Sequence, residues 1–254
     1  MRALVTNDDG VEAMGLRTLA RVAVDVGLDV VVAAPHREAS GSSASLTALE
    51  ADGRLLVHER QLQGLEGTPV RAVEAGPGFI ALAAARGAFG PVPDLVLSGI
   101  NHGPNTGHAV LHSGTVGAAL TSATRGCRAL AVSIAGARPE HFATAAEVAR
   151  LALDWLLDTE GPVVLNVNVP DVPVTELRGV RRATLAAFGA VQANVAEVGE
   201  GYVKLLFADV DAEREPGTDA ALLADGWAAI TALLAPCEAT GVDLSALERP
   251  SWPP

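Results

Sequence analysis

Three polar clusters in this sequence combine the residue types and the spacing that phosphate and metal chemistry require. They are Asn7-Asp8-Asp9-Gly10, Ala39-Ser40-Gly41-Ser42-Ser43, and a longer run from Ser98 to Thr115. Each cluster follows a short apolar run, and open α/β sheets bind ligands outside the carboxyl ends of their strands. We therefore expect the three clusters to converge at one edge of a sheet.

The first cluster presents two adjacent carboxylates, Asp8 and Asp9, directly before Gly10. Adjacent side chains on a regular strand point to opposite faces, but glycine lets the backbone turn so that both can face one cation. Mg²⁺ and Mn²⁺ prefer such oxygen ligands. These residues are also common in turns, so a turn without a metal is an equal alternative. The pair is not Asp-x-Asp, which disfavours a phosphatase that forms an aspartyl-phosphate.

The other two clusters offer hydroxyl, amide and backbone groups. Small residues around Ser40 suit a loop that approaches a ligand closely, although a flexible polar loop has the same composition. Asn101 can give an oxygen to a metal or an amide to phosphate. Ser113-Gly114-Thr115 precedes an apolar run, and the N-terminus of a helix is a natural phosphate site. Glycine there avoids a Cβ that would intrude on the anion. The alternative is that Ser113 or Thr115 serves only as a helix cap.

Several common site types lack their signatures. The glycines fit neither G-x-G-x-x-G nor G-x-x-x-x-G-K-[ST], and no G-x-S-x-G is present. His108 and His112 are spaced H-x-x-x-H, but Ala109 replaces the glutamate of a zinc protease, so a zinc site is disfavoured. We expect His102, His108 and His112 at the rim of the substrate site or in structural roles, where one can donate a proton to a leaving oxygen. We expect His58 and His141 at the protein surface.

The elements that must position these clusters alternate between strand and helix. Apolar runs predict strands at 2–6, 29–34, 94–99, 129–134 and 162–170, and helical spacing predicts helices at 15–26, 115–126 and 140–158. This order implies parallel βαβ units covered by helices on both faces. We therefore predict a single α/β domain over 1–254, with its core in 1–170. The short apolar pieces at 179–186, 202–208 and 226–233 predict antiparallel hairpins, so 171–254 is expected to be a hairpin and oligomerisation region with a tail.

Composition bounds the function. The 254 residues are 49% hydrophobic and 19% charged, with a net charge of −12, so a sizeable core is available. That charge disfavours nucleic-acid binding but leaves room for one small anionic ligand. The two cysteines, Cys127 and Cys237, match no metal or disulfide framework and are expected to be small buried residues. Charges interrupt the longest aliphatic stretch, so we expect a soluble cytoplasmic protein with no membrane partner.

Taken together, the motifs resemble the SurE family (stationary-phase survival protein, a metal-dependent 5'/3'-nucleotidase). The combination of Asn7-Asp8-Asp9-Gly10, the Ser98-Gly99-Ile100-Asn101 run with Gly103, and Ser113-Gly114-Thr115-Val116 is highly specific. Similar segments extend through nearly the whole chain, from the N-terminal MRALVTNDDG to PGTDAALLADGWAAIT.

The resemblance implies a Rossmann-like α/β core with a swapped or protruding hairpin, assembled as a homodimer or homotetramer. It also implies hydrolysis of nucleoside monophosphates with one divalent metal ion per subunit, Mg²⁺ or Mn²⁺. Carried over, the metal ligands fall on Asp8, Asp9, Ser40 and Asn101. Phosphate contacts fall on Asn101, Ser113, Gly114 and Thr115. Either Asp8 or Asp9 is then the catalytic group that orients the attacking water or accepts its proton.

Six positions depart from the family pattern without removing a ligand: Met14, His36, Arg71, His108, Ala109 and His112. They change the surroundings of the site and therefore bear on substrate preference. Three functions stay open: a 5'-nucleotidase, an exopolyphosphatase or broader phosphatase, and a catalytically weak nucleotide-binding regulatory protein. The sequence leaves the base, the choice between 5' and 3' phosphates, and the physiological metal undetermined.

Overall fold

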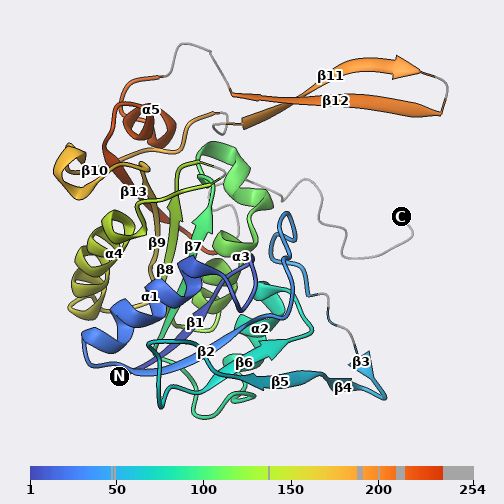
Figure 1. Ribbon diagram of the computed structural model, residues 1–254, viewed down its shortest axis with the longest axis vertical. Helices are drawn as coiled ribbons and strands as arrows, with labels where there is room; N and C mark the ends of the chain where they lie inside the picture. Colours follow the sequence, from blue (N-terminus) through green and yellow to red (C-terminus); the bar gives the residue numbers. More distant parts are fainter. Residues whose placement is uncertain are drawn as a thin grey trace, which may run out of the picture.

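A nine-stranded sheet with helices on both faces forms the body of the chain in a computed structural model (Figure 1). The structure describes residues 1–46, 48, 50–136, 138–187, 191–199, 201–209 and 215–236. The strand order is β10-β13-β9-β8-β7-β1-β2-β6-β5. Within this order, the neighbours in the run β9-β8-β7-β1-β2-β6 all pair in parallel. Strand β5 runs antiparallel to β6, and β13 runs antiparallel to β9. The predicted mostly parallel α/β fold is confirmed.

The strands of this sheet are short, and all except the edge strands β5 and β10 are mainly apolar. They are β1 (Arg2–Thr6), β2 (Asp29–Pro35), β5 (Val57–Arg60), β6 (Val70–Val73), β7 (Leu95–His102), β8 (Arg128–Ile134), β9 (Val164–Val169), β10 (Val180–Arg182) and β13 (Ala228–Leu233). The central strands are buried on both faces, as their continuous apolar runs predict for a covered parallel sheet. Leu4 and Val5 show the consequence, because these neighbours on β1 enter different core clusters.

Two helices cover each face. α1 (Met14–Asp25) and α4 (Phe142–Leu157) bring Leu16, Leu19 and Leu153 to the cluster that contains Val5. α2 (Pro77–Ala84) and α3 (Gly114–Ala123) bring Ile80 and Val116 to the opposite cluster. Helices α1, α3 and α4 correspond to the three predicted helices, within a few residues at their ends.

Helix α1 lies very close to β7, the strand that leads to Asn101. A Cβ added at Gly15 would stand 1.9 Å from the carbonyl oxygen of Ile100, so only glycine allows this approach. The core therefore fixes the position of β7 relative to the helix that follows Asp8 and Asp9.

The C-terminal part corrects the sequence prediction. Of the three pieces expected as hairpins, 179–186 and 226–233 instead supply β10 and β13, which extend the large sheet. The piece at 202–208 does lie in an antiparallel hairpin, β11 (Val191–Gly199) with β12 (Tyr202–Asp209), which projects from the body (Figure 1). Strand β13 joins the sheet because Ala228 and Ala229 are apolar and fully buried, and periodicity alone does not distinguish a hairpin strand from a sheet strand.

The remaining elements had no specific prediction. They are β3 (Glu50–Ala51), β4 (Arg54–Leu55), β5, β6, α2, the 3₁₀ helices η1 (Gly107–His112) and η2 (Val174–Glu176), and α5 (Asp219–Ala224). Cys127 is buried, as predicted, while Cys237 lies outside the described residues. Over the described ranges, no helix has the length and apolar character needed to cross a membrane.

Candidate active site

Asp8 is the buried centre of the candidate site. It follows β1 and is only 4% exposed. Its Oδ2 accepts a hydrogen bond of 3.1 Å from the backbone N–H of Thr115, and its Oδ1 accepts one from the Thr115 hydroxyl. Burial raises the pKa of Asp8, and the hydrogen bonds from Thr115 and Gly114 only partly offset it. The N-terminus of α3 therefore points its donors at a carboxylate, as the partial positive charge at a helix start favours.

Gly114 is required for this contact, for a different reason from the one the sequence suggested. A Cβ at this position would stand 2.8 Å from Asp8 Oδ2 and 2.8 Å from Ser42 Oγ. A side chain at this position would therefore strike Asp8 and Ser42 even with no ligand bound, and its predicted effect on phosphate stays a prediction. Gly114 lets α3 close on β1, and this packing sets the position of the Asp8 carboxylate.

Asp9 is more accessible and faces the loop after β7. Its Oδ2 accepts a 3.3 Å hydrogen bond from the backbone N–H of His102. Burial, followed by the negative charge of Asp8, raises the pKa of Asp9 to about 6, with a smaller contribution from Glu38. Over the described part of the chain, neither aspartate has a lysine or arginine partner within salt-bridge distance. Two neighbouring acids without a protein counter-ion are suited to a bound cation.

Asn101 and Ser40 lie in the loops around this pair, but each side chain contacts its own loop. Asn101 donates from Nδ2 to the carbonyl of Gly103 at 2.7 Å, so its amide oxygen is the atom left to accept or ligate. The Ser40 hydroxyl is exposed and donates to Glu38 Oε1 at 2.7 Å. The backbone of this loop is nevertheless joined to the first cluster, because Ala39 N–H donates to the Asp8 carbonyl at 2.7 Å.

The cap and turn alternatives describe real features of the same loops. Ser113 Oγ accepts a hydrogen bond of 3.0 Å from Val116 N–H, so Ser113 caps α3. Asn7 Nδ2 donates to the Gly10 carbonyl at 3.0 Å and Asn7 Oδ1 accepts from Gly10 N–H at 3.3 Å, which closes the turn that carries both aspartates. Turn geometry and ligand presentation are thus compatible in one segment.

The histidines separate into rim and structural residues. His108 and His112 lie on η1 with exposed side chains. Among the described residues, no three His, Cys, Asp or Glu side chains gather as a group that could hold a metal ion. The centroid of the His102 ring lies 5.5 Å from the centroid of the Phe142 ring.

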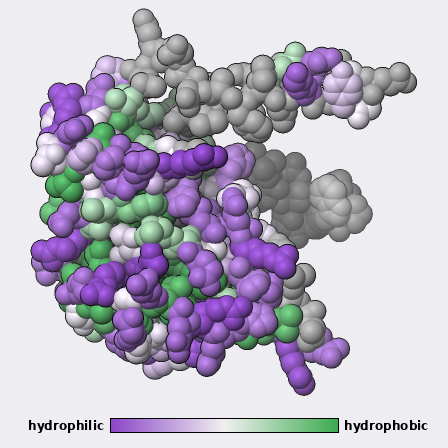
Figure 2. Space-filling view, in the orientation of Figure 1, coloured by the Kyte–Doolittle hydropathy of each residue, from purple (hydrophilic) through white to green (hydrophobic). Residues whose placement is uncertain are grey.

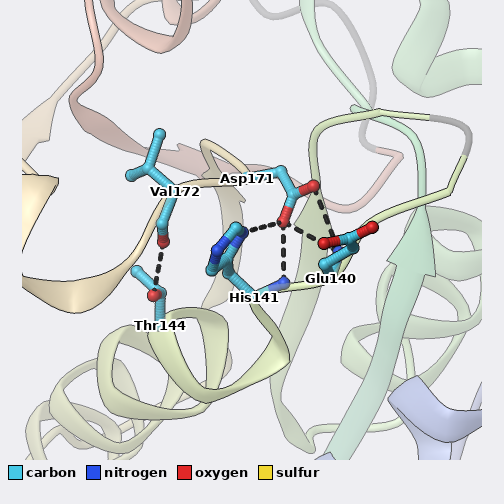
Figure 3. A network of polar contacts seen from close by, with 5 residues as sticks. All are labelled: Glu140, His141, Thr144, Asp171 and Val172. Carbon is cyan, nitrogen blue, oxygen red and sulfur yellow. Dashed lines mark hydrogen bonds and ion pairs between the residues drawn. The ribbon is translucent and has the colours of Figure 1, made fainter.

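His141 is more than a surface residue. Asp171 Oδ1 accepts hydrogen bonds from His141 Nδ1 at 2.9 Å and from His141 N at 2.8 Å, while Glu140 N–H donates to both Asp171 oxygens (Figure 3). Partial burial acts to raise the pKa of Asp171, but these hydrogen bonds outweigh it and lower the pKa. The cluster fixes the start of α4, where Phe142 packs beside His102. His58, in contrast, is largely exposed, as predicted.

Sequence reasoning missed two residues of this region. Ser42 Oγ is buried without a hydrogen-bond partner among the described residues, and it lies beside Gly114 at the start of α3. Glu38 adds a third acid near Asp9. Both belong to a stretch of small and polar residues whose composition gives no sign of which side chains turn inward.

Three of the positions that depart from the family pattern, Arg71, His36 and Met14, have different surroundings. Arg71 donates to the Phe89 carbonyl at 3.1 Å, which gives it a structural role. His36 and His58 both approach Glu74, with Nε2-to-Oε1 distances of 4.0 and 3.7 Å. Met14 is half exposed at the start of α1.

The surface in Figure 2 is mostly hydrophilic with scattered hydrophobic patches. A recess of about 640 Å³ is lined by residues between Glu59 and Arg71, and it includes none of the predicted site residues. The candidate site is therefore defined by its side chains at the carboxyl ends of β1 and β7, and not by this recess.

Comparison with known proteins agrees with the geometry. Residues 3–191 match the family model described as Survival protein SurE. The chain is 38% identical to a protein named 5'-nucleotidase SurE from Methylococcus capsulatus, over 98% of this chain and 94% of that one. It is 37% identical to a 5'/3'-nucleotidase SurE from Proteus mirabilis, over 92% and 89%. The solved structure of SurE protein from Aquifex aeolicus superposes with a TM-score of 0.77 at 28% identity, covering 94% of this chain and 95% of that one.

Proposed function

The chain belongs to the SurE family, and on that premise we propose that it is a divalent-metal-dependent 5'-nucleotidase, which hydrolyses nucleoside monophosphates to nucleoside and phosphate. The observation that carries the proposal is the Asp8–Asp9 pair, two neighbouring acids with raised pKa values at the carboxyl end of β1. They adjoin the N-terminus of α3, which is a favourable place for phosphate.

The residues present fit a divalent cation. Asp8 and Asp9 offer carboxylate oxygens, and among the ion pairs of the described ranges none involves either of them. The amide oxygen of Asn101 and the hydroxyl of Ser40 would complete an oxygen donor set of the kind that Mg²⁺ and Mn²⁺ take. Ser40 can keep its donor bond to Glu38 while a lone pair of its hydroxyl oxygen ligates the cation.

The chemistry divides between the cation and the chain. When bound, a divalent cation supplies Lewis-acid charge at the phosphoryl oxygen and makes water a better nucleophile. Asp9 is mostly ionised at pH 7, because its pKa is about 6, and it can orient the attacking water or accept its proton. Thr115, Gly114 and the capped start of α3 stabilise negative charge on the phosphate oxygens. Asn101 would contact both the cation, through its amide oxygen, and the phosphate, and one of the exposed histidines His102, His108 and His112 can protonate the leaving oxygen.

Under this proposal, phosphate and the Asp8 carboxylate use the same hydrogen-bond donors. Thr115 N–H and Oγ1 donate to Asp8 in the structure. Substrate binding therefore involves a redistribution of these hydrogen bonds, with the Asp8 carboxylate compensated by the cation. The exopolyphosphatase and broad-phosphatase alternatives use the same site, because none of these groups reads the base.

A substrate panel tests the function. We expect release of phosphate from nucleoside 5'-monophosphates with Mn²⁺ or Mg²⁺, and none after EDTA treatment. Nucleoside 3'-monophosphates, polyphosphate and a synthetic phenyl phosphate complete the panel. Faster turnover of polyphosphate than of nucleotides would favour the exopolyphosphatase alternative. Nucleotide binding without turnover at any metal concentration would contradict the proposal and favour a regulatory protein.

We also propose that the chain is one domain and assembles as a homodimer or homotetramer through its C-terminal region. The β11–β12 hairpin projects from the body in Figure 1, and an isolated two-stranded hairpin is marginally stable in water. A second copy is therefore expected to cover it. Light scattering should give a mass of at least two chains, and a monomer at micromolar concentration would contradict this assembly. A cytoplasmic location without nucleic-acid partners remains a prediction from the charge.

A further inference from the structure

Asp219 is a buried carboxylate far from Asp8 in sequence, yet it contacts the loop that leads to α3. It is fully buried at the first position of α5. Its Oδ2 accepts a hydrogen bond of 2.8 Å from Gly107 N–H, the first residue of η1. Its Oδ1 accepts from Ala186 N–H at 3.0 Å and from Ala220 N–H at 2.8 Å. One side chain thus joins three separate segments.

Asp219 joins η1, which leads to α3, to residues 184–186, which follow β10 and are called here the root of the β11–β12 hairpin. Ala186 follows β10 on the chain path toward β11, and nearby Thr184 accepts from Asp219 N–H at 2.8 Å. Gly107 begins η1, which ends directly before the Ser113 cap of α3. Because η1 is a single short helix, a displacement at Gly107 is transmitted to the Ser113-Gly114-Thr115 turn.

A second anchor holds the same loop from the sheet side. Asn105 N–H donates to Asn168 Oδ1 at 2.7 Å, and Asn105 Nδ2 donates to Ser133 Oγ at 2.8 Å. Asn166 and Asn168 both donate to the Asn105 carbonyl. The loop between Asn101 and η1 is therefore held at Asn105 by β8 and β9, and Asp219 adds the tie at Gly107, where η1 begins. Further along η1, Ser43 Oγ donates to the Leu111 carbonyl at 2.7 Å.

We propose that Asp219 is a positioning residue of the nucleotidase, which sets the phosphate-binding turn by tying η1 to the root of the β11–β12 hairpin. The proposal rests on the function proposed above for its effect on turnover. It predicts that the hairpin root and the phosphate turn respond together when this carboxylate is changed, although Asp219 itself touches no substrate.

Asp219→Asn separates the two attachments. The asparagine amide has one acceptor oxygen and one NH₂ group. With its oxygen toward Ala186 and Ala220, it keeps these two hydrogen bonds. Its NH₂ group then faces the N–H of Gly107, and because both are donors this hydrogen bond is lost. The variant should therefore keep α5 and release η1. Thr218→Ala is the matched control, because it removes the N-cap of α5, whose hydroxyl accepts from Ala221 N–H at 3.3 Å, and does not touch Gly107.

For Asp219→Asn we expect kcat/KM with nucleoside 5'-monophosphates to fall about 10- to 100-fold, mainly through KM, since small displacements of positioning groups have costs of this size. The inhibition constant of inorganic phosphate should rise in parallel. Mn²⁺ affinity without phosphate should stay within about threefold of the parent. Thr218→Ala should lower thermal stability and leave kcat/KM within about twofold, as expected for a cap alone.

Amide hydrogen exchange gives a readout that is independent of turnover. Exchange over residues 107–113 should accelerate in Asp219→Asn and stay near the parental rate in Thr218→Ala. Unchanged exchange, unchanged kcat/KM in an active parent, or an equal loss in Thr218→Ala would each overturn the proposal. If the parent hydrolyses no phosphate ester, the proposed function fails, and the exchange comparison alone decides whether Asp219 positions η1.

Discussion

The two sides of the proposed metal site differ in how much of their geometry the fold determines. On the Asp8 side, both carboxylate oxygens accept hydrogen bonds from the first residues of α3, and the surrounding residues are buried. On the Ser40 side, the hydroxyl is exposed and bonded to Glu38, two residues away. The Asp8 half of the site is thus positioned by core packing, whereas the Ser40 side chain has only a local partner, although Ser43 in the same loop donates to the distant Leu111 carbonyl at 2.7 Å.

The difference follows from what lies behind each group. Asp8 extends from a central strand, and Gly114 brings α3 against it, so movement of either would disrupt the packing of the core. The Ser40 loop is tied to this frame through the backbone, by the Ala39 N–H bond to Asp8. We infer that the Asp8 side is ready before a ligand arrives, whereas the Ser40 side takes its final arrangement with the cation.

Among the changes that compare the two sides, the largest effect is expected from Gly114→Ala, which alters the Asp8 side. The new Cβ would stand 2.8 Å from both Asp8 Oδ2 and Ser42 Oγ, so the carboxylate must move. A displacement of about 1 Å can cost about 100-fold in rate. We expect losses of this size in both turnover and Mn²⁺ affinity, measured by steady-state kinetics and calorimetry. Adding Ser42→Ala should recover part of the loss, and parental Mn²⁺ binding by Gly114→Ala would show that α3 does not position Asp8.

A smaller effect is expected from pH. Divalent cations bind the ionised carboxylate, and burial together with the charge of Asp8 raises the pKa of Asp9 to about 6 in the metal-free chain. Protons therefore compete with the metal as pH falls through 6, and the raised pKa of Asp8 adds to this competition. Calorimetry at pH 5 and pH 7.5 should show an apparent Mn²⁺ affinity at least about tenfold weaker at the lower pH. Equal affinities in a chain that circular dichroism shows to be folded at both would contradict this.

The smallest effect is expected from Ser40→Ala on the loop side. Its neutral, exposed hydroxyl is a weak ligand beside two carboxylates, so its net gain on binding the cation is small, on the order of one neutral hydrogen bond. We expect Mn²⁺ affinity to weaken by about tenfold or less, with thermal stability unchanged. Glu38→Gln is the matched comparison, because it weakens the partner that orients this hydroxyl and should not reduce affinity by more than Ser40→Ala does. If Ser40→Ala lost as much Mn²⁺ affinity as Gly114→Ala, the contrast between the Asp8 side and the Ser40 side would be contradicted.

The sequence predicted the parts of the molecule in which local pattern and burial coincide. Apolar runs located β1, β2, β7, β8 and β9, and helical spacing located α1, α3 and α4. The clusters after β1 and β7 were correctly expected at one edge of the sheet, because parallel strands end together.

Other features depend on contacts between distant segments. Strands β10 and β13 were read as hairpins because short apolar pieces have the same pattern at a sheet edge and in a hairpin. The contact of Gly114 with Asp8 and Ser42 was not predicted, since the atoms that its Cβ would strike lie far away along the chain. The Asp219 contacts to Gly107 and Ala186 have no local signal at all.

The most direct test of the central claim is a Mn²⁺ titration of the metal-stripped chain, of Asp8→Asn and of Asp9→Asn, following phosphate release from a nucleoside 5'-monophosphate. Changes beside a metal ligand typically cost about 10- to 100-fold, so removing a carboxylate ligand should cost about 100-fold or more in apparent Mn²⁺ affinity or turnover. We predict no activity in the stripped parent, saturable recovery with Mn²⁺, and near-complete loss in both variants while their circular dichroism stays parental. Parental activity in either variant across the titration, or full activity of the stripped parent, would contradict the assignment of Asp8 and Asp9 as the metal site.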